Sequence, residues 1–386
     1  MFTIEMLPAY LGDSLWIEYG DPAKPSRILI DGGLVGTAAA IEKKIEAVAE
    51  QDGRCHLELL VVTHIDGDHI EGMVKLLGRA GLPLDVDDVW FNGHKHMPDP
   101  DGGDREEFLG ARQAEFMSVL IEHAGHPWNA WRQGGTIYVS PVSRGALPAH
   151  TLPGGMKLTL VSPRYEELLD LSKDWERELE KAGLDKATEQ ELIEALLADR
   201  KLAPDDDDFL SAKTMDIAKL IAAKSDGDHS KANGASIAFV AEYERASCLL
   251  TGDGWSDVLS AGIDRLNQER GNVRLPLTAL KVPHHGSQNN VDDELLQRLA
   301  TRRFLISTDG SRFRHPDREA VARILAGPWR PDPKHDEPID LYFNYRSTAN
   351  RVWDDPKLAE QWNYRTHYPA EGQEGLVFDV AGSSDE

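Results

Sequence analysis

Cysteine is scarce in this chain of 386 residues, which contains only Cys55 and Cys248. Two cysteines cannot build a disulfide framework, and each lies beside an apolar, strand-like run, so we expect buried free thiols in a reducing compartment. The sequence also lacks an apolar run long enough to cross a membrane. The first residues, Met1–Glu5, lack the basic segment and apolar core of a signal peptide, so we expect a cytoplasmic protein.

Basic residues are also scarce relative to acidic ones. The chain has 42 lysines and arginines and 66 aspartates and glutamates, which gives a formal net charge of −24. Tight, nonspecific binding to nucleic acid needs clustered basic residues, so this composition disfavours it. It does not exclude a nuclease, because a bound metal or a local basic patch reverses the field near a site. The run Asp205–Asp208 is typical of a solvated loop.

Metal-binding side chains, in contrast, are concentrated in Thr63–His69, which holds two histidines and two aspartates. The preceding apolar run, Leu57–Val62, predicts a buried strand, and Ile70–Leu77 has the spacing of a helix. A lone Asp66 or Asp68 at this point would be interpreted as a helix N-cap. Two imidazoles and two carboxylates on one strand-to-helix turn instead favour a metal site.

Strands and helices alternate around this turn. Short apolar runs predict strands over Leu15–Tyr19 and Arg27–Ile30, and apolar residues at helical spacing predict a helix over Thr37–Glu50. This order predicts a layered α/β architecture.

Two later strands also run directly into residues with metal-binding atoms. The apolar run Ser247–Leu250 leads into Thr251–Asp253, and Leu277–Val282 leads into His284 and His285. Imidazole nitrogens and carboxylate oxygens are ligands for zinc, and carboxylates also suit manganese.

These motifs, in this order, resemble those of the metallo-β-lactamase-fold hydrolases. Aspartate at position 66, where that superfamily usually has histidine, and the string His284–Ser287 resemble the ComEC-like branch, as does the Gly-Asp turn at Gly12–Ser14. The resemblance implies a four-layer αββα sandwich over residues 1–330. It also implies a helical insertion at 164–231 and a C-terminal extension at 331–386 that packs on the domain and ends in disordered residues.

The resemblance also implies roles for individual residues. The implied metal ligands are His64, Asp66, Asp68, His69, Asp253, His284 and His285, and the sequence leaves open which of the last two binds metal. Asp253 would bridge two ions, which makes physical sense because an anion offsets their repulsion. Asp31 would support the site from behind, with an ordinary turn aspartate as the alternative.

Three further roles follow for the reaction. Asp68 would also orient the attacking water, and Lys281 would add positive charge near the site. His315 would protonate the leaving group or contact the substrate. The alternative for Lys281 is an ordinary strand lysine.

The chain also departs from the family pattern. The histidine ligand expected before Thr251–Asp253 has no clear match, and His150 is the nearest candidate. The lack of this histidine ligand, together with aspartate at position 66, makes the ligand set of the site rich in oxygen. We expect two zinc ions, with manganese as the alternative. His94 with His96, and Asp226–His229, are interpreted as loop residues.

These features predict a metal-dependent hydrolase in which a metal-bound hydroxide attacks a phosphodiester, in nucleic acid or in a small molecule. A carbonyl ester or lactone is the alternative substrate. A non-catalytic interaction protein that retains the fold is the alternative function, with the inserted helices contacting a protein partner. We expect no membrane partner, and the sequence leaves the oligomeric state open.

Overall fold

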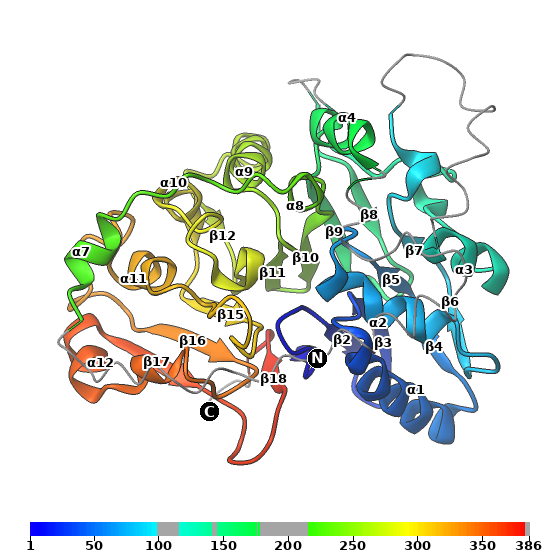
Figure 1. Cartoon of the computed structure of the whole chain (residues 1–386), viewed down its shortest axis with the longest axis horizontal. Helices are drawn as coiled ribbons and strands as arrows, with labels where there is room; N and C mark the ends of the chain where they lie inside the picture. The colour runs from blue at the N-terminus through cyan, green and yellow to red at the C-terminus, as the bar shows by residue number, and fades with distance from the viewer. Residues whose placement is uncertain (99–115, 141–144, 176, 178–214, 383–386) are drawn as a thin grey trace.

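The computed structural model describes residues 1–98, 116–140, 145–175, 177 and 215–382 of the chain. Two large β-sheets make up its centre, and helices lie outside them (Figure 1). The mixed α/β architecture predicted from the alternation of strands and helices is therefore confirmed in outline.

The first large sheet has six strands and the second has eight. In spatial order, the six are β18 (Leu376–Asp379), β1 (Phe2–Met6), β2 (Leu15–Asp21), β3 (Lys24–Ile30), β5 (Leu59–Val61) and β7 (Val89–Trp90). The eight are β17 (Tyr364–His367), β16 (Ile339–Phe343), β15 (Arg303–Ile306), β13 (Ala279–Lys281), β11 (Ala246–Leu250), β10 (Ala238–Tyr243), β9 (Lys157–Ser162) and β8 (Ala149–Thr151). Two small sheets pair β4 (Cys55–Leu57) with β6 (Leu84–Val86) and β12 (Leu275–Pro276) with β14 (Leu299–Ala300).

The two faces of the six-stranded sheet are both apolar but have different neighbours. Ile17 and Ile28 belong to a core cluster shared with the eight-stranded sheet, whereas Trp16 and Leu29 belong to a second cluster that includes helix residues. Alternation along a strand places successive side chains on opposite faces, which accounts for this division. The helices of the second cluster are α1 (Ala38–Asp52), α2 (Gly67–Leu77), α3 (Phe116–Ala124), α4 (Tyr165–Lys173) and α8 (Lys231–Gly234).

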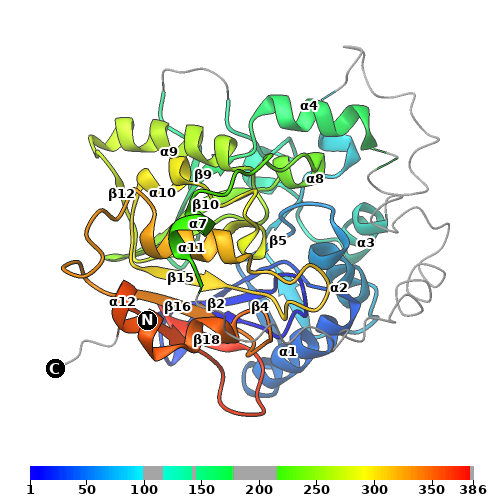
Figure 2. The same ribbon diagram turned by 60° about the vertical axis from the view of Figure 1, so that its left-hand side comes forward.

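Another group of helices packs on the eight-stranded side of the molecule. It comprises α7 (Ile217–Ile221), α9 (Ser256–Arg270), α10 (Asp293–Gln297), α11 (Arg318–Ala326) and α12 (Pro356–Trp362). In Figures 1 and 2, α9 and α11 lie on the opposite side of the molecule from α1. Short 3-10 helices complete the described chain: η1 (Val35–Thr37), η2 (His94–His96), η5 (Ala130–Arg132), η6 (Pro283–Gly286) and η7 (Arg351–Asp354).

Parallel strands bring the polar motifs of the two sheets together. β3, β5 and β7 are parallel in the first sheet, and β11, β13 and β15 are parallel in the second. The two sheets are joined beyond these strand ends, where the backbone N–H of Ile237 donates to the carbonyl oxygen of Thr63 at 2.9 Å. The Ser307 hydroxyl likewise donates to the carbonyl oxygen of Gly12 at 2.9 Å.

Glycines allow the first turn of α2 to approach the rest of the site closely. A Cβ added to Gly12 would lie 1.7 Å from the carbonyl oxygen of Asp68, and one added to Gly72 would lie 1.9 Å from that of Gly32. Backbone bonds hold this contact, since Gly32 N–H donates to His69 O at 2.7 Å and Gly72 N–H donates to Gly33 O at 3.0 Å. The position of Asp68 and His69 therefore depends on residues without side chains.

Two predicted boundaries beside the central turn are wrong. The strand predicted over Leu57–Val62 is split at Glu58, because β4 pairs with β6 in a small sheet whereas β5 pairs with β3 in the six-stranded sheet. The helix predicted from Ile70 begins at Gly67, so Asp68 and His69 belong to its first turn.

The C-terminal residues participate in both large sheets. β16 and β17 extend the eight-stranded sheet, and β18 pairs with β1 of the other sheet, so no break in either sheet coincides with the boundary expected at residue 330. Ile339–Phe343 forms an inner strand of its sheet, between β17 and β15.

Several expectations fall partly or wholly outside the described residues. The insertion at 164–231 is described only at its ends, by α4, α7 and α8. The acidic run Asp205–Asp208 and residues 383–386 lie outside the described part.

Both cysteines are buried and form no disulfide, as predicted. Within the described ranges, none of the helices has the length and apolar character needed to span a bilayer.

We expect Gly72→Ala to lower the free energy of unfolding by about 1–3 kcal/mol, because the added methyl group collides with the backbone at Gly32. Chemical unfolding followed by tryptophan fluorescence measures this change. Ala39→Ser, on the exposed side of α1, is the control and should stay within about 0.5 kcal/mol of the wild type. Equal stability of the two variants would contradict this account of the contact.

Candidate metal centre

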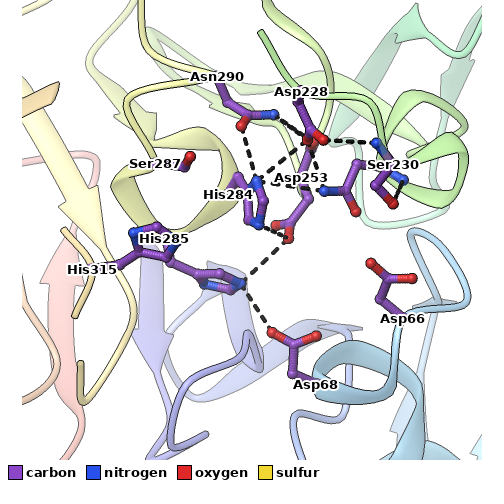
Figure 3. Close-up of polar contacts among 12 residues, drawn as sticks. Asp66, Asp68, Asp228, Ser230, Asp253, His284, His285, Ser287, Asn290 and His315 are labelled. Atoms are coloured by element: carbon purple, nitrogen blue, oxygen red, sulfur yellow. Dashed lines mark hydrogen bonds and ion pairs between the residues drawn. The ribbon is translucent and has the colours of Figure 1, made fainter. Parts of the chain in front are cut away.

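The three sequence motifs meet at the ends of the strands that carry them. Asp31 follows β3, the turn with His64 and Asp66 follows β5, Asp253 follows β11, and the 3-10 helix η6 with the paired histidines follows β13. Figure 3 shows the rings of His284 and His285 directed toward Asp253, with Asp66 and Asp68 on the facing segment.

Hydrogen bonds set the tautomers of His69 and His285. The Nδ1 of His69 lies 2.8 Å from the carboxylate of Asp31, and the Nδ1 of His285 lies 2.9 Å from the backbone carbonyl of Ser307. Both partners are acceptors, so each Nδ1 carries the proton and each neutral ring presents a bare Nε2. The two Nε2 atoms are 3.3 Å apart, which places two lone pairs toward one another.

The same reasoning applies to His64 and His284. Thr63 Oγ1 donates its hydrogen to Asp31 at 2.7 Å, so it accepts from the Nδ1 of His64 at 2.9 Å. The Nδ1 of His284 lies 2.9 Å from the side-chain oxygen of Asn290 and 3.3 Å from the carboxylate of Asp228. All four histidines therefore hold their protons on Nδ1 and turn Nε2 inward.

Carboxylate oxygens occupy the space that these nitrogens face. Oδ2 of Asp253 lies 3.2 Å from Nε2 of His69, 3.4 Å from that of His285, 3.7 Å from that of His284 and 3.9 Å from that of His64. Oδ2 of Asp68 is 3.3 Å from Nε2 of His285. With neutral imidazoles, every atom of this group is an acceptor, and the group needs cations to hold it together.

The lack of positive charge among these carboxylates and neutral imidazoles shifts several pKa values in the site. Burial lowers the pKa of His69 and His285, but the surrounding carboxylates, Asp253 first, raise both pKa values well above the usual range. Burial, together with Asp68 and Asp253, raises the pKa of Asp66 to about 7. Burial lowers the pKa of His64 to about 3, with His69 adding to the shift. Bound protons or bound metal ions would therefore stabilise the cluster.

The spacing fits metal better than direct hydrogen bonds. Two ligand atoms on one tetrahedral ion, each about 2.0–2.2 Å from it, lie roughly 3.3–3.6 Å apart, whereas hydrogen bonds between nitrogen and oxygen are near 2.9 Å. Nε2 of His64 and Oδ1 of Asp253 are buried without a hydrogen-bond partner among the described residues. These residues can therefore hold divalent ions.

The ligand atoms form two groups that share Asp253. His69, His285 and Asp68 form one group with it. A second group joins His64 with His69 and Asp253. Nε2 of His284 lies 3.7 Å and that of His285 3.4 Å from Oδ2 of Asp253, and Oδ2 of Asp66 lies 3.8 Å from Nε2 of His64. Among the residues that the structure describes, His285 but not His284 belongs to a group that could hold a metal ion, and the choice between them stays a prediction.

Lys281 does not face this space. Its side chain is fully buried and its ammonium group is ion-paired with the equally buried Asp13. Asp13 lies 3.5 Å from the Nδ1 of His285, so Lys281 acts on the site only through Asp13 and the outer side of that ring. The positive charge that we expected Lys281 to add near the site is paired with Asp13 behind the ring of His285, and a role of Lys281 in the reaction stays a prediction.

Two residues near the site were missed as site residues. Asp228 lies in the loop before α8 that we interpreted as non-ligating, and its carboxylate accepts from the side-chain amides of Asn233 at 2.8 Å and Asn290 at 2.9 Å. Asp228 and Asn290 together hold His284 (Figure 3). Nothing in the local sequence marks Asn290 as a site residue. For Asp228, the acidic string Asp226–His229 was the one feature that could have done so.

Of the four other histidines that the sequence analysis singled out by number, one lies near the site and three lie elsewhere. The ring centroid of His315 lies 5.6 Å from that of His284, and its Nδ1 lies 3.1 Å from Asp317. His150 packs against Trp131 on β8, and His94 and His96 lie in η2. Within the described chain, the last three belong to none of the groups that could hold a metal ion.

No known protein family and no curated protein matches the chain in sequence. Among solved structures, a mutant of CmlA beta-hydroxylase aligns with 98% of this chain and 53% of its own chain, at 9% identity and a TM-score of 0.37. A metallo-beta-lactamase from Cronobacter sakazakii, described by its HARLDQ motif, aligns with 41% of this chain and 51% of its own, at 20% identity and a TM-score of 0.19. The chain thus spans about half the length of each, and similarities this low decide neither its fold nor its function.

We expect Asp13→Asn to lower the free energy of unfolding at pH 7 by about 3–5 kcal/mol, because it leaves the buried ammonium group of Lys281 without a counter-ion. Urea unfolding followed by tryptophan fluorescence measures this loss. Asp85→Asn is the matched control, since Asp85 pairs with Arg54 in an exposed ion pair worth about 0–1 kcal/mol.

The same variant has a predictable pH dependence. Burial raises the pKa of Asp13, but Lys281 and His285 outweigh it and hold the pKa below the usual range. A folded-state pKa below the unfolded value of about 3.9 stabilises the protein above pH 4. The difference in free energy of unfolding between the wild type and Asp13→Asn should therefore decrease as the pH falls below about 4. A difference that stays constant with pH would contradict this assignment.

Proposed function

We propose that this protein is a metal-dependent hydrolase with the four-layer metallo-β-lactamase fold, of the ComEC-like branch, and that it binds two divalent ions. The observation that carries the proposal is the convergence of four bare Nε2 atoms on the shared carboxylate of Asp253. In this assignment, one ion is held by His69, His285, Asp68 and Asp253, and the other by His64, Asp66, His284 and Asp253. Imidazoles favour zinc, and the oxygen of Asp66 in place of a nitrogen makes manganese the alternative.

Divalent ions bound there would supply an ionised water near neutral pH and would polarise the substrate. The Asp68 side chain is 19% exposed, that of His284 is 25% exposed and that of Asp66 is 33% exposed, so these three side chains are the ones in the cluster that a substrate reaches most easily. Asp68 is placed to hold a water proton. His315 is placed to give a proton to the leaving group, with its Nδ1 held by Asp317 and its ring beside His284.

The cysteines do not provide an alternative nucleophile. Both are buried, and burial raises the pKa of Cys55 to about 11 and that of Cys248 to about 12, so neither forms a thiolate at neutral pH. A hydrolase with this site therefore depends on water.

A phosphodiester is the substrate that we propose. Its negative charge matches a pair of divalent ions, which would be the positive charge available to it because the ammonium group of Lys281 is neutralised by Asp13. The formal net charge of −24 favours a small or locally held phosphodiester over long duplex DNA.

We expect the wild-type chain to retain about two zinc or manganese ions after reconstitution and removal of free metal. Asp253→Asn should weaken metal binding by more than about tenfold, because it removes the charge shared by both groups. Elemental analysis and competition with a fluorescent chelator measure the loss. Asp264→Asn, an exposed position on α9, makes the same chemical change elsewhere and should bind as the wild type does.

Metal content well below one ion per wild-type chain would reject the metal site and favour a non-catalytic interaction protein.

We expect the metal-loaded protein to hydrolyse bis-p-nitrophenyl phosphate and a DNA dinucleotide. His315→Gln should slow cleavage of the dinucleotide by about 10²-fold or more, because its alkoxide leaving group needs a proton. The same change should barely affect bis-p-nitrophenyl phosphate, whose phenolate leaves unprotonated. Steady-state rates on both substrates test this, with the exposed His335→Gln as control.

Equal slowing on both substrates would remove the proton-donor role from His315. Turnover of a lactone panel without turnover of any phosphodiester would reject the proposed substrate class and leave the carbonyl alternative.

A further inference from the structure

A second site lies at the other end of the eight-stranded sheet. A cavity of about 650 Å³ is lined by residues just before β13, β15 and β16 and by the first half of β17, which are the amino-terminal ends of parallel strands. The metal centre lies beyond the carboxyl ends of β11 and β13. Because β13 and β15 have three and four residues, roughly 10–13 Å of strand separates the two sites.

Arginine dominates the charge of this cavity. Four arginines and two acidic residues line it: Arg274, Arg302, Arg303, Arg365, Glu337 and Asp340. In a chain with a formal net charge of −24, this lining reverses the local field and attracts anions.

Internal ion pairs use only part of the positive charge. Asp340 binds Arg365 through two contacts, Nε to Oδ1 at 2.8 Å and Nη2 to Oδ2 at 2.9 Å. Arg302 pairs with Asp336 at 2.6 Å. Among the residues that the structure describes, Arg274 and Arg303 have no ion-pair partner.

The Arg274 guanidinium is held in place without an acceptor. It lies 5.5 Å from the ring centroid of Trp329, and the guanidinium of Arg302 lies 5.7 Å from the same ring. The indole N–H of Trp329 donates to the backbone carbonyl of Arg323 at 2.8 Å, which fixes the ring. Nε and Nη2 of Arg274 are buried with no hydrogen-bond partner in the described part of the chain. Buried donors of this kind are costly unless a ligand acceptor meets them.

We propose that this cavity binds a small anion that carries two or more phosphate charges, such as an organic phosphate or an oligophosphate. Guanidinium groups offer paired N–H donors whose spacing matches phosphate oxygens. The volume is larger than a single inorganic phosphate requires and lies in the range of about 300–1,000 Å³ typical of small-molecule sites. This site is separate from the metal centre, and its existence does not depend on the proposed hydrolase activity.

Calorimetric titration of the metal-free full chain with tripolyphosphate tests the proposal. We expect binding at one site per chain, and both Arg274→Gln and Arg303→Gln should weaken it by more than about tenfold. Arg54→Gln removes the same charge from an exposed ion pair beside the small sheet of β4 and β6 and should change the affinity by less than about twofold. Asp253→Asn should leave binding unchanged, because the metal centre is not involved.

Two comparisons complete the test. Citrate, which carries similar charge on carboxylates, should bind at least about tenfold more weakly than tripolyphosphate. Circular dichroism checks folding, and if Arg274→Gln does not fold, the result with Arg303→Gln decides. Absence of tripolyphosphate binding, equal losses in all three arginine variants, or citrate binding as tight as tripolyphosphate would each overturn the proposal.

Discussion

A surplus of hydrogen-bond acceptors at one point is the constraint on which the site depends. Four imidazoles hold their protons on the outer nitrogen, and their inner nitrogens meet the carboxylates of Asp68 and Asp253. The carboxylates and the imidazole lone pairs of this group repel one another unless protons or cations bind between them. The outer partners, Asp31 and the carbonyl of Ser307 among them, matter as much as the ligands, because they decide which nitrogen is bare.

The fold satisfies this constraint by joining the ends of parallel strands from two different sheets. Close backbone contact at Gly12 and at Gly72 brings the first turn of α2 against its neighbours, and the buried pair of Lys281 and Asp13 stands behind the ring of His285. The same parallel strands place an arginine-rich cavity at their opposite ends. The acceptor-rich metal centre and the arginine-rich cavity therefore lie at opposite ends of the same strands, even though the chain as a whole is strongly acidic.

Sequence patterns were informative where a strand ran directly into polar residues. His64–His69, Asp253 and the pair His284 and His285 were identified in this way, and the structure brings them together. The patterns failed where a segment or a polar group has its partner far away in the chain. The predicted strand divides at Glu58 because its two halves pair with strands of different sheets, and the ammonium of Lys281 is neutralised by Asp13, 268 positions earlier. Neither contact leaves a trace in local spacing.

By itself, the sequence determined the α/β alternation, the strand-end position of each motif and the kind of atoms that each motif offers. These are local properties, set by hydrophobic period and residue chemistry. The tertiary structure alone decided that both His284 and His285 face Asp253, that Asp228 and Asn290 hold His284, and that Lys281 lies behind the site. Those outcomes depend on how two sheets pack and on contacts between distant segments, and side-chain direction across such a contact is not encoded in the spacing of either segment.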